Sequence, residues 1–337
     1  MRTFARFTLL AAAVLLASSS ALSGTWTVGR GRNDCDGPCN FHDESIGGEI
    51  GGGIERAMVN PFVVPGDTVL VFPCRSDTLC APSDSLSGGY TIRFNMKSGV
   101  VLKSKAGPDS TVICGSAGSE SAITMTLTSA NTIIDGFTIS WDSQNTGLGG
   151  AIACLGASGT IRNCVFRNCF AGSGAAIYAQ NSDVLVSNNV FIDNECAAGA
   201  GTIAVSTGAP TIRNNTFFGS VAPFGTDSSV LYASGSAHKF VRNIIVGSRG
   251  APAIFCGGTN DADSTACNIF WDNDQGPAAG GCVDSTGTSE NIAADPLFCD
   301  PTPTDLPSLA GICNANPQDV NEGDFHFGAP CERWMAK

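Results

Sequence analysis

The chain contains aspartates and arginines, the residue types with which a lyase could cleave an acidic polysaccharide. A lyase for such a substrate needs carboxylates that hold calcium against the acid groups of the sugar, and a basic side chain near the proton that is removed. The candidate catalytic residues are Asp135, Asp193, Arg213 and Arg242, with Arg167 as a further candidate base. They fall at different phases of the repeat described below, so the sequence alone does not predict that they cluster.

A set of arginines could bind an anionic chain. Arg162, Arg213 and Arg242 each directly precede an asparagine of the repeat, and we expect them to point outward from one flank. Two arginines ~5 Å apart repel by roughly 1 kcal/mol in water, and a uronate polymer lying along the flank would relieve that repulsion. Solvated side chains balanced by the excess of carboxylates are the alternative.

Two short acidic loops are candidate metal ligands. They contain Asp261 with Asp263, and Asp272 with Asp274. Calcium uses such oxygens, but neither loop has the full pattern that ends in a glutamate, so solvated loops are the alternative. The leading prediction is that the protein has no cofactor, and calcium is the one alternative.

Other side chains with chemical potential are scattered. The three histidines stand alone in the sequence and are predicted to be surface residues: His42, His238 and His326. Aromatic rings could stack on sugars, and the candidates are Trp141, Tyr178, Tyr232 and Trp271, half of which are expected to fill the core or turns instead.

These residues are set in a repeat. Six similar segments, rich in β-formers, recur every 25 to 29 residues, and their polar centres are Asp135, Asn163, Asn188, Asn214, Asn243 and Asn268. Such a period without helical periodicity is typical of stacked coils, each of which buries its apolar face only against its neighbours. The sequence predicts an all-β fold, a single right-handed parallel β-helix, with asparagines stacked at its turns.

The predicted organisation has four parts. Residues 1–23 read as an export signal, residues 24–60 as an N-terminal strand and cap, residues 61–275 as the β-helix, and residues 276–337 as an irregular closing segment rich in cysteine and proline. No later stretch has the roughly 20 apolar residues of a membrane span, so no transmembrane anchor is predicted.

Cysteine content and charge constrain the setting. All 15 cysteines follow the signal, which favours an oxidising compartment and disulfides. The best inter-coil pair is Cys169 with Cys196, on successive coils. The formal charge of −12 argues against nonspecific nucleic-acid binding, which needs a basic surface.

A family resemblance supports the fold. Residues 64–73 (VPGDTVLVFP) and 99–113 (GVVLKSKAGPDSTVI) resemble the opening of secreted right-handed parallel β-helix proteins of the pectate-lyase-like superfamily. Residues 149–152 (GGAI), with FIDN at 191–194 and FWDN at 270–273, are similar to the repeats of chlamydial polymorphic outer-membrane proteins. The resemblance covers about residues 60–331 and implies the fold. It implies no particular activity, because the superfamily holds lyases, hydrolases, epimerases and adhesins.

The leading functional hypothesis is a secreted protein, extracellular, periplasmic or on the cell surface. It would be a noncatalytic scaffold for an acidic polysaccharide or cell-surface glycan, and no oligomeric state is predicted. The alternative is a calcium-dependent polysaccharide lyase or a related glycoside hydrolase. Aspartates and arginines gathered on one face would favour the enzyme, and an even face with asparagines only at its turns would favour the scaffold.

Overall fold

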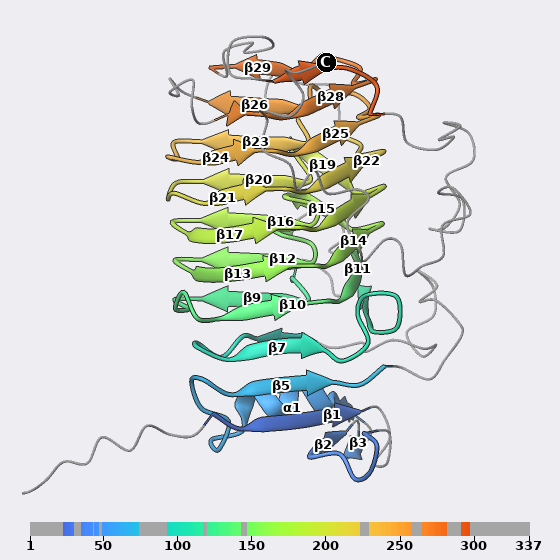
Figure 1. Cartoon of the computed structure of the whole chain (residues 1–337), viewed down its shortest axis with the longest axis vertical. Coiled ribbons are helices and arrows are strands. Elements are labelled where there is room, and N and C mark those ends of the chain that lie inside the picture. Colours follow the sequence, from blue (N-terminus) through green and yellow to red (C-terminus); the bar gives the residue numbers. More distant parts are fainter. Residues whose placement is uncertain are drawn as a thin grey trace, which may run out of the picture.

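Short parallel strands stack into a right-handed solenoid along the long axis of the molecule (Figure 1). The computed structural model describes residues 23–29, 35–42, 44–46, 49–73, 93–116, 120–142, 147–222, 229–257, 265–281 and 291–296. The predicted β-helix is confirmed. None of the helices in these ranges is long and apolar enough to cross a membrane.

Three parallel sheets, here called I, II and III, form the walls. Sheet I contains β2 (Phe41–His42), β1 (Thr25–Gly29), β5 (Thr68–Val71), β7 (Val101–Ser104), β10 (Ile133–Asp135), β13 (Ser158–Arg162), β17 (Asp183–Ser187), β21 (Thr211–Arg213), β24 (Lys239–Val241) and β27 (Thr265–Ala266). Sheet II contains β8 (Val112–Ser116), β11 (Thr138–Asp142), β14 (Val165–Arg167), β15 (Phe170–Ser173), β18 (Val190–Ile192), β19 (Glu195–Ala200), β22 (Thr216–Phe218), β25 (Ile244–Val246), β28 (Ile269–Trp271) and β30 (Ile292–Ala293). Sheet III contains β6 (Phe94–Asn95), β9 (Ile123–Thr126), β12 (Ile152–Leu155), β16 (Ile177–Gln180), β20 (Ile203–Ser206), β23 (Leu231–Ser234), β26 (Ile254–Gly257) and β29 (Ala278–Gly280).

The core is a set of inward columns, one or two from each sheet. Alternate residues of a strand point inward, and parallel register places equivalent residues of successive coils above one another. Inside sheet II, Phe166, Phe191 and Phe217 are fully buried and stacked, with ring centroids 4.8 and 4.5 Å apart. Each buried Phe contributes about 2–3 kcal/mol relative to an exposed one, and no single coil could provide that burial alone.

A ladder of buried asparagines occupies the turn between sheets I and II. Each of the first four rungs donates from Nδ2 to the Oδ1 of the rung on the next coil, at 3.0–3.1 Å, and also to a backbone carbonyl of the preceding coil. Oδ1 also accepts the backbone N–H of the rung before it. The rungs are Asn189, Asn215, Asn243, Asn268 and Asn291.

The predicted single column of polar centres was wrong, because the turn has two asparagine positions. Asn163, Asn188 and Asn214 lie one residue before the rung, in the left-handed region with φ between 53° and 57°. On later coils this position holds Arg242 and then Cys267. The polar centres predicted for those coils, Asn243 and Asn268, are therefore rungs and not members of the same column as Asn163, Asn188 and Asn214.

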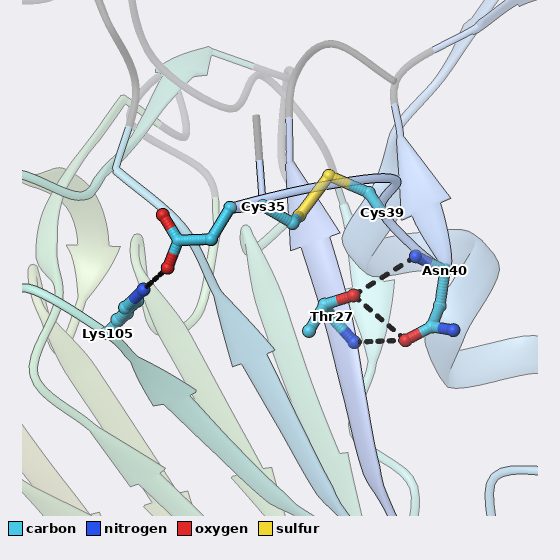
Figure 2. Close-up of a disulfide and its surroundings, with 6 residues drawn as sticks. Thr27, Cys35, Cys39, Asn40 and Lys105 are labelled. Carbon is cyan, nitrogen blue, oxygen red and sulfur yellow. Dashed lines mark hydrogen bonds and ion pairs between the residues drawn. A yellow bond between two sulfur atoms is a disulfide. The ribbon is translucent and has the colours of Figure 1, made fainter. Parts of the chain in front are cut away.

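At the N-terminal end α1 (Gly53–Val59) packs beside β1 and β5, and its buried residues join the core (Figure 1). Next to it, a disulfide links Cys35 to Cys39 (Figure 2). Asn40 anchors this loop to β1 by accepting the backbone N–H of Thr27 at 2.7 Å, and Asp36 pairs with Lys105. The loop is thus held against the solenoid.

The solenoid extends further at both ends than predicted. β1 already pairs with β5 in sheet I, so the sheet begins before residue 61. β29 and β30 extend sheets III and II beyond residue 275. The described residues also include a small antiparallel hairpin, β3 (Glu44–Ile46) with β4 (Glu49–Gly51). Residues 1–22 of the predicted export signal and residues 297–337 of the predicted closing segment lie outside the described residues.

Candidate functional site

The outer face of sheet III carries aromatic and small side chains in strict register. One outward column reads Asn95, Thr124, Ala153, Tyr178, Ala204, Tyr232, Phe255 and Ala279. Neighbouring strands of a sheet lie about 4.8 Å apart, so the two tyrosines, on alternate coils, lie about 10 Å apart along the axis.

The tyrosines present their rings on this face. Tyr178 and Tyr232 are half-buried, whereas Ala153 and Ala204 between and beside them are buried. The ring of Tyr232 is parallel to that of Phe255, with the centroids 5.4 Å apart and the planes inclined by 1°. This stacking restricts the Tyr232 ring, so it is ordered before any ligand arrives.

A second outward column beside the first supplies polar groups. It reads Thr126, Leu155, Gln180, Ser206, Ser234 and Gly257, and neither column contains a charged side chain. Aromatic faces next to hydroxyl and amide groups suit a sugar, whose ring has an apolar face and a polar edge. The arrangement can bind and orient a neutral ligand.

A glycine turn positions this face. Gly174 precedes β16 with φ of 61°, and a Cβ at this position would lie 2.4 Å from the Ile177 carbonyl oxygen. Only glycine fits such a close approach. The turn directs Ile177 inward and therefore Tyr178 outward. The sequence had singled out both tyrosines, but it missed Phe255 and the polar column, which only become neighbours through the register.

Asp135, a candidate catalytic residue, is committed to an ion pair. Its Oδ2 accepts hydrogen bonds from Arg162 Nε at 3.0 Å and Nη2 at 2.9 Å, and its Oδ1 accepts one from Asn163 Nδ2 at 2.8 Å. The carboxylate is 6 % exposed. Both oxygens are therefore occupied by neighbours on the next coil, which is a structural role.

The predicted arginine column is interrupted. On sheet I the register aligns Lys103, Asp135, Arg162, Ser187, Arg213, Val241 and Ala266. Arg242 is out of register, since it occupies the left-handed turn position after Val241. Arg162 is neutralised by Asp135, so Arg213 is the one exposed arginine left in that column among the described residues.

The remaining acidic candidates do not gather into one site. Asp193 is half-buried in a turn, and burial raises the pKa of its carboxyl. Asp272 and Asp274 pair with Arg249, whose nitrogens lie 3.2 and 3.5 Å from them, so a guanidinium takes the place expected for calcium. Asp261 and Asp263 lie outside the described residues. Within the described ranges no three His, Cys, Asp or Glu side chains are grouped as metal ligands.

The predicted Cys169–Cys196 disulfide is wrong. The register places Cys196 opposite Ala171, while the backbone N–H of Cys169 donates to Asn194 Oδ1 at 2.9 Å. Each thiol donates to a different carbonyl, that of Ile139 for Cys169 and that of Gly172 for Cys196. Disulfides do occur elsewhere, since Cys114, Cys256 and Cys267 are bonded in addition to Cys35 and Cys39.

The prediction that His238 is a surface residue also fails. His238 is 2 % exposed, packs on Phe240 with a centroid distance of 4.4 Å, and has Nδ1 3.1 Å from the Ser236 hydroxyl. Burial lowers its pKa to about 4, so the ring is neutral at pH 7. Trp141 is 2 % exposed and donates to the Glu120 carbonyl, whereas Trp271 is 44 % exposed. His326 lies outside the described residues.

Comparison with known proteins agrees with the geometry. The family model for a right-handed β-helix region matches residues 88–269. The chain belongs to the right-handed β-helix family. A search of curated proteins found no match. The match covers most of sheets I, II and III, including both tyrosines, and it carries the fold rather than an activity.

Proposed function

We propose that this protein is an exported, noncatalytic scaffold that binds glycan chains along the outer face of sheet III. The observation that carries the proposal is the column containing Tyr178 and Tyr232, uncharged and flanked by hydroxyl and amide groups. An ordered sheet that presents tyrosine rings two coils apart suits an extended polymer. A sugar unit in an extended chain advances by a length similar to one coil, so the two tyrosines would meet alternate sugars.

The chemistry of the face favours a neutral glycan over an acidic one. Binding of a uronate chain would call for cations along its path, and neither outward column of sheet III has one. The arginines of sheet I do not supply a continuous alternative, because Asp135 occupies Arg162. Export is supported by the disulfides, which form and persist in oxidising compartments.

Affinity electrophoresis through gels that contain soluble xylan, mannan or pectate tests the proposal. We expect retardation by a neutral glycan, and we expect Tyr178→Ala and Tyr232→Ala each to weaken binding roughly three- to tenfold, the worth of one aromatic stacking contact. Phe62→Ala is the matched control, because Phe62 is 74 % exposed and follows α1 at the N-terminal end, several coils before β16. Equal loss in all three variants would refute a site on sheet III.

A lyase assay on the same protein preparations tests the enzymatic alternative. Absorbance of unsaturated uronate is followed on pectate and alginate, with calcium and with a chelator. A scaffold gives no rise. A calcium-dependent rise would identify a lyase and overturn the proposal, and loss of that rise in Arg213→Ala would place the reaction on sheet I.

A further inference from the structure

The outer face of sheet II differs in kind from that of sheet III. One outward column, here called the sheet II column, starts with a cation and continues with apolar side chains: Arg167, Ile192, Phe218, Val246 and Trp271. The adjacent column is also largely apolar, and all of its members except Ile269 are buried: Val165, Val190, Thr216, Ile244 and Ile269. The face therefore has little to offer the hydroxyl groups of a sugar.

The side chains of the column differ in exposure. Ile192 and Phe218 are half-buried, and Trp271 is 44 % exposed. Val246, the smallest of them, is buried between the larger Phe218 and Trp271. A line of apolar atoms thus runs along the solenoid axis for four coil steps, about 19 Å.

Arg167 is an unusual cation for this molecule. It is half-buried, and burial lowers the pKa of its guanidinium. Arg162 and Arg249 are neutralised by aspartates, whereas no ion pair or side-chain hydrogen bond to the Arg167 guanidinium is found among the described residues. A partly desolvated charge without a partner is unfavourable, and a bound anion would offset that cost.

We propose that the sheet II column binds the anion of a long-chain fatty acid. The carboxylate accepts paired hydrogen bonds from Arg167, and the alkyl chain lies over Ile192, Phe218 and Val246 to reach Trp271. The charge pattern decides the class of ligand, since one cation at one end of an apolar line complements one anionic head with an apolar tail. The length also fits, because the sheet II column of about 19 Å can accommodate an acyl chain. The lipid tails of one leaflet span about 15 Å, half of the roughly 30 Å hydrocarbon core of a bilayer.

Titration with hexadecanoate, dodecanoate and octanoate below their micelle concentrations tests this site, with tryptophan fluorescence and calorimetry as readouts. We expect affinity to rise with chain length, and a fluorescence change that Trp271→Phe removes while calorimetry still records binding. Hexadecanol and acetate each provide only half of the ligand and should bind far more weakly. Absence of hexadecanoate binding, or binding that does not depend on chain length, overturns the proposal.

Variants locate the head group. Arg167→Gln should weaken hexadecanoate binding roughly 10- to 100-fold, the worth of a charge-assisted hydrogen-bonded pair. Arg213→Gln, an exposed arginine on sheet I, is the matched control and should bind as the wild type does. Should Arg167→Gln fail to fold by circular dichroism, Phe218→Ser tests the tail with the arginine intact. Wild-type affinity in Arg167→Gln or in a folded Phe218→Ser would refute the site. Glycan binding by sheet III is measured separately, so either proposal can fail alone.

Discussion

The Oδ1 atom of Asn189 accepts a hydrogen bond from the backbone N–H of Cys164 at 2.9 Å. Cys164 therefore occupies the rung position of the asparagine ladder on the coil before the first asparagine. Its sulfur lies where a rung would place Oδ1, close to the backbone N–H of Phe137. The ladder is directional, since each of its first four rungs donates to the oxygen of the following rung, and this makes the contribution of each position testable.

Two adjacent asparagines should respond very differently to substitution by glycine. Asn215→Gly removes the acceptor for Asn189 and the donor to the Val186 carbonyl, which leaves buried polar groups unpaired and should cost about 3 kcal/mol of unfolding free energy. Asn214→Gly should be nearly neutral, because φ of 54° suits glycine and the Asn214 Oδ1 makes no hydrogen bond. Urea unfolding measures both. Similar losses at the two positions would contradict a ladder centred on residue 215.

Extending the ladder should stabilise the fold. Cys164→Asn places an amide where Nδ2 can reach Asn189 Oδ1 and a carbonyl of the preceding coil, and we expect a gain of about 1 kcal/mol in thermal or urea unfolding. The control is Cys154→Asn, whose thiol lies in the apolar core beside Met125, at 4.0 Å between sulfurs. There the same amide has no ladder to join and should cost about 2 kcal/mol or more. A loss of stability in Cys164→Asn would mean that the rung geometry does not reach residue 164.

The sequence was sufficient for those features that a coil repeats. The inward column of sheet II, with Phe166, Phe191 and Phe217, follows from alternation and period alone. The fold class was predicted for that reason.

The rest depended on register between coils, which a slip of one residue changes completely. Asp135 was predicted to be a polar centre of the repeat, but the strand pairing places it opposite Arg162. Arg242 was predicted to continue the arginine column, but Val241 is the residue paired with Arg213. That no ion pair or side-chain hydrogen bond reaches the Arg167 guanidinium among the described residues is likewise a relationship in space, and the neighbouring sequence gives no signal of it.

The N-terminal end should be sensitive to acid through Asp67. Burial alone would raise the pKa of this carboxyl, but hydrogen bonds from the backbone N–H groups of Val64 and Gly24 and from the Trp26 indole outweigh it and lower the pKa. A carboxyl with a lower pKa in the folded state stabilises the fold above its unfolded value near 3.8, and that stability is lost as pH falls through the folded pKa.

Asp67→Asn should therefore lose about 2 kcal/mol at pH 7, because an amide cannot accept with both atoms. The gap to the wild type should shrink as pH drops below 3.8. Urea unfolding at pH 7 and pH 3 measures this difference. A gap that stays constant across that range would show that the charge of Asp67 does not contribute.

The buried thiols should resist alkylation until the chain unfolds. Burial raises the pKa values of Cys154, Cys164 and Cys169 to about 12, so roughly one thiol in ten thousand is ionised at pH 8, and the sulfur is also shielded from reagent. Iodoacetamide at pH 8 followed by peptide mass spectrometry should find all three unmodified in the native protein. In urea without reductant all three should be modified, because unfolding restores ordinary thiol pKa values. A Cys169 that stays unlabelled in urea, with its peptide linked to that of Cys196, would instead require the inter-coil disulfide, and would mean that the register opposing Cys196 to Ala171 is not the one in solution.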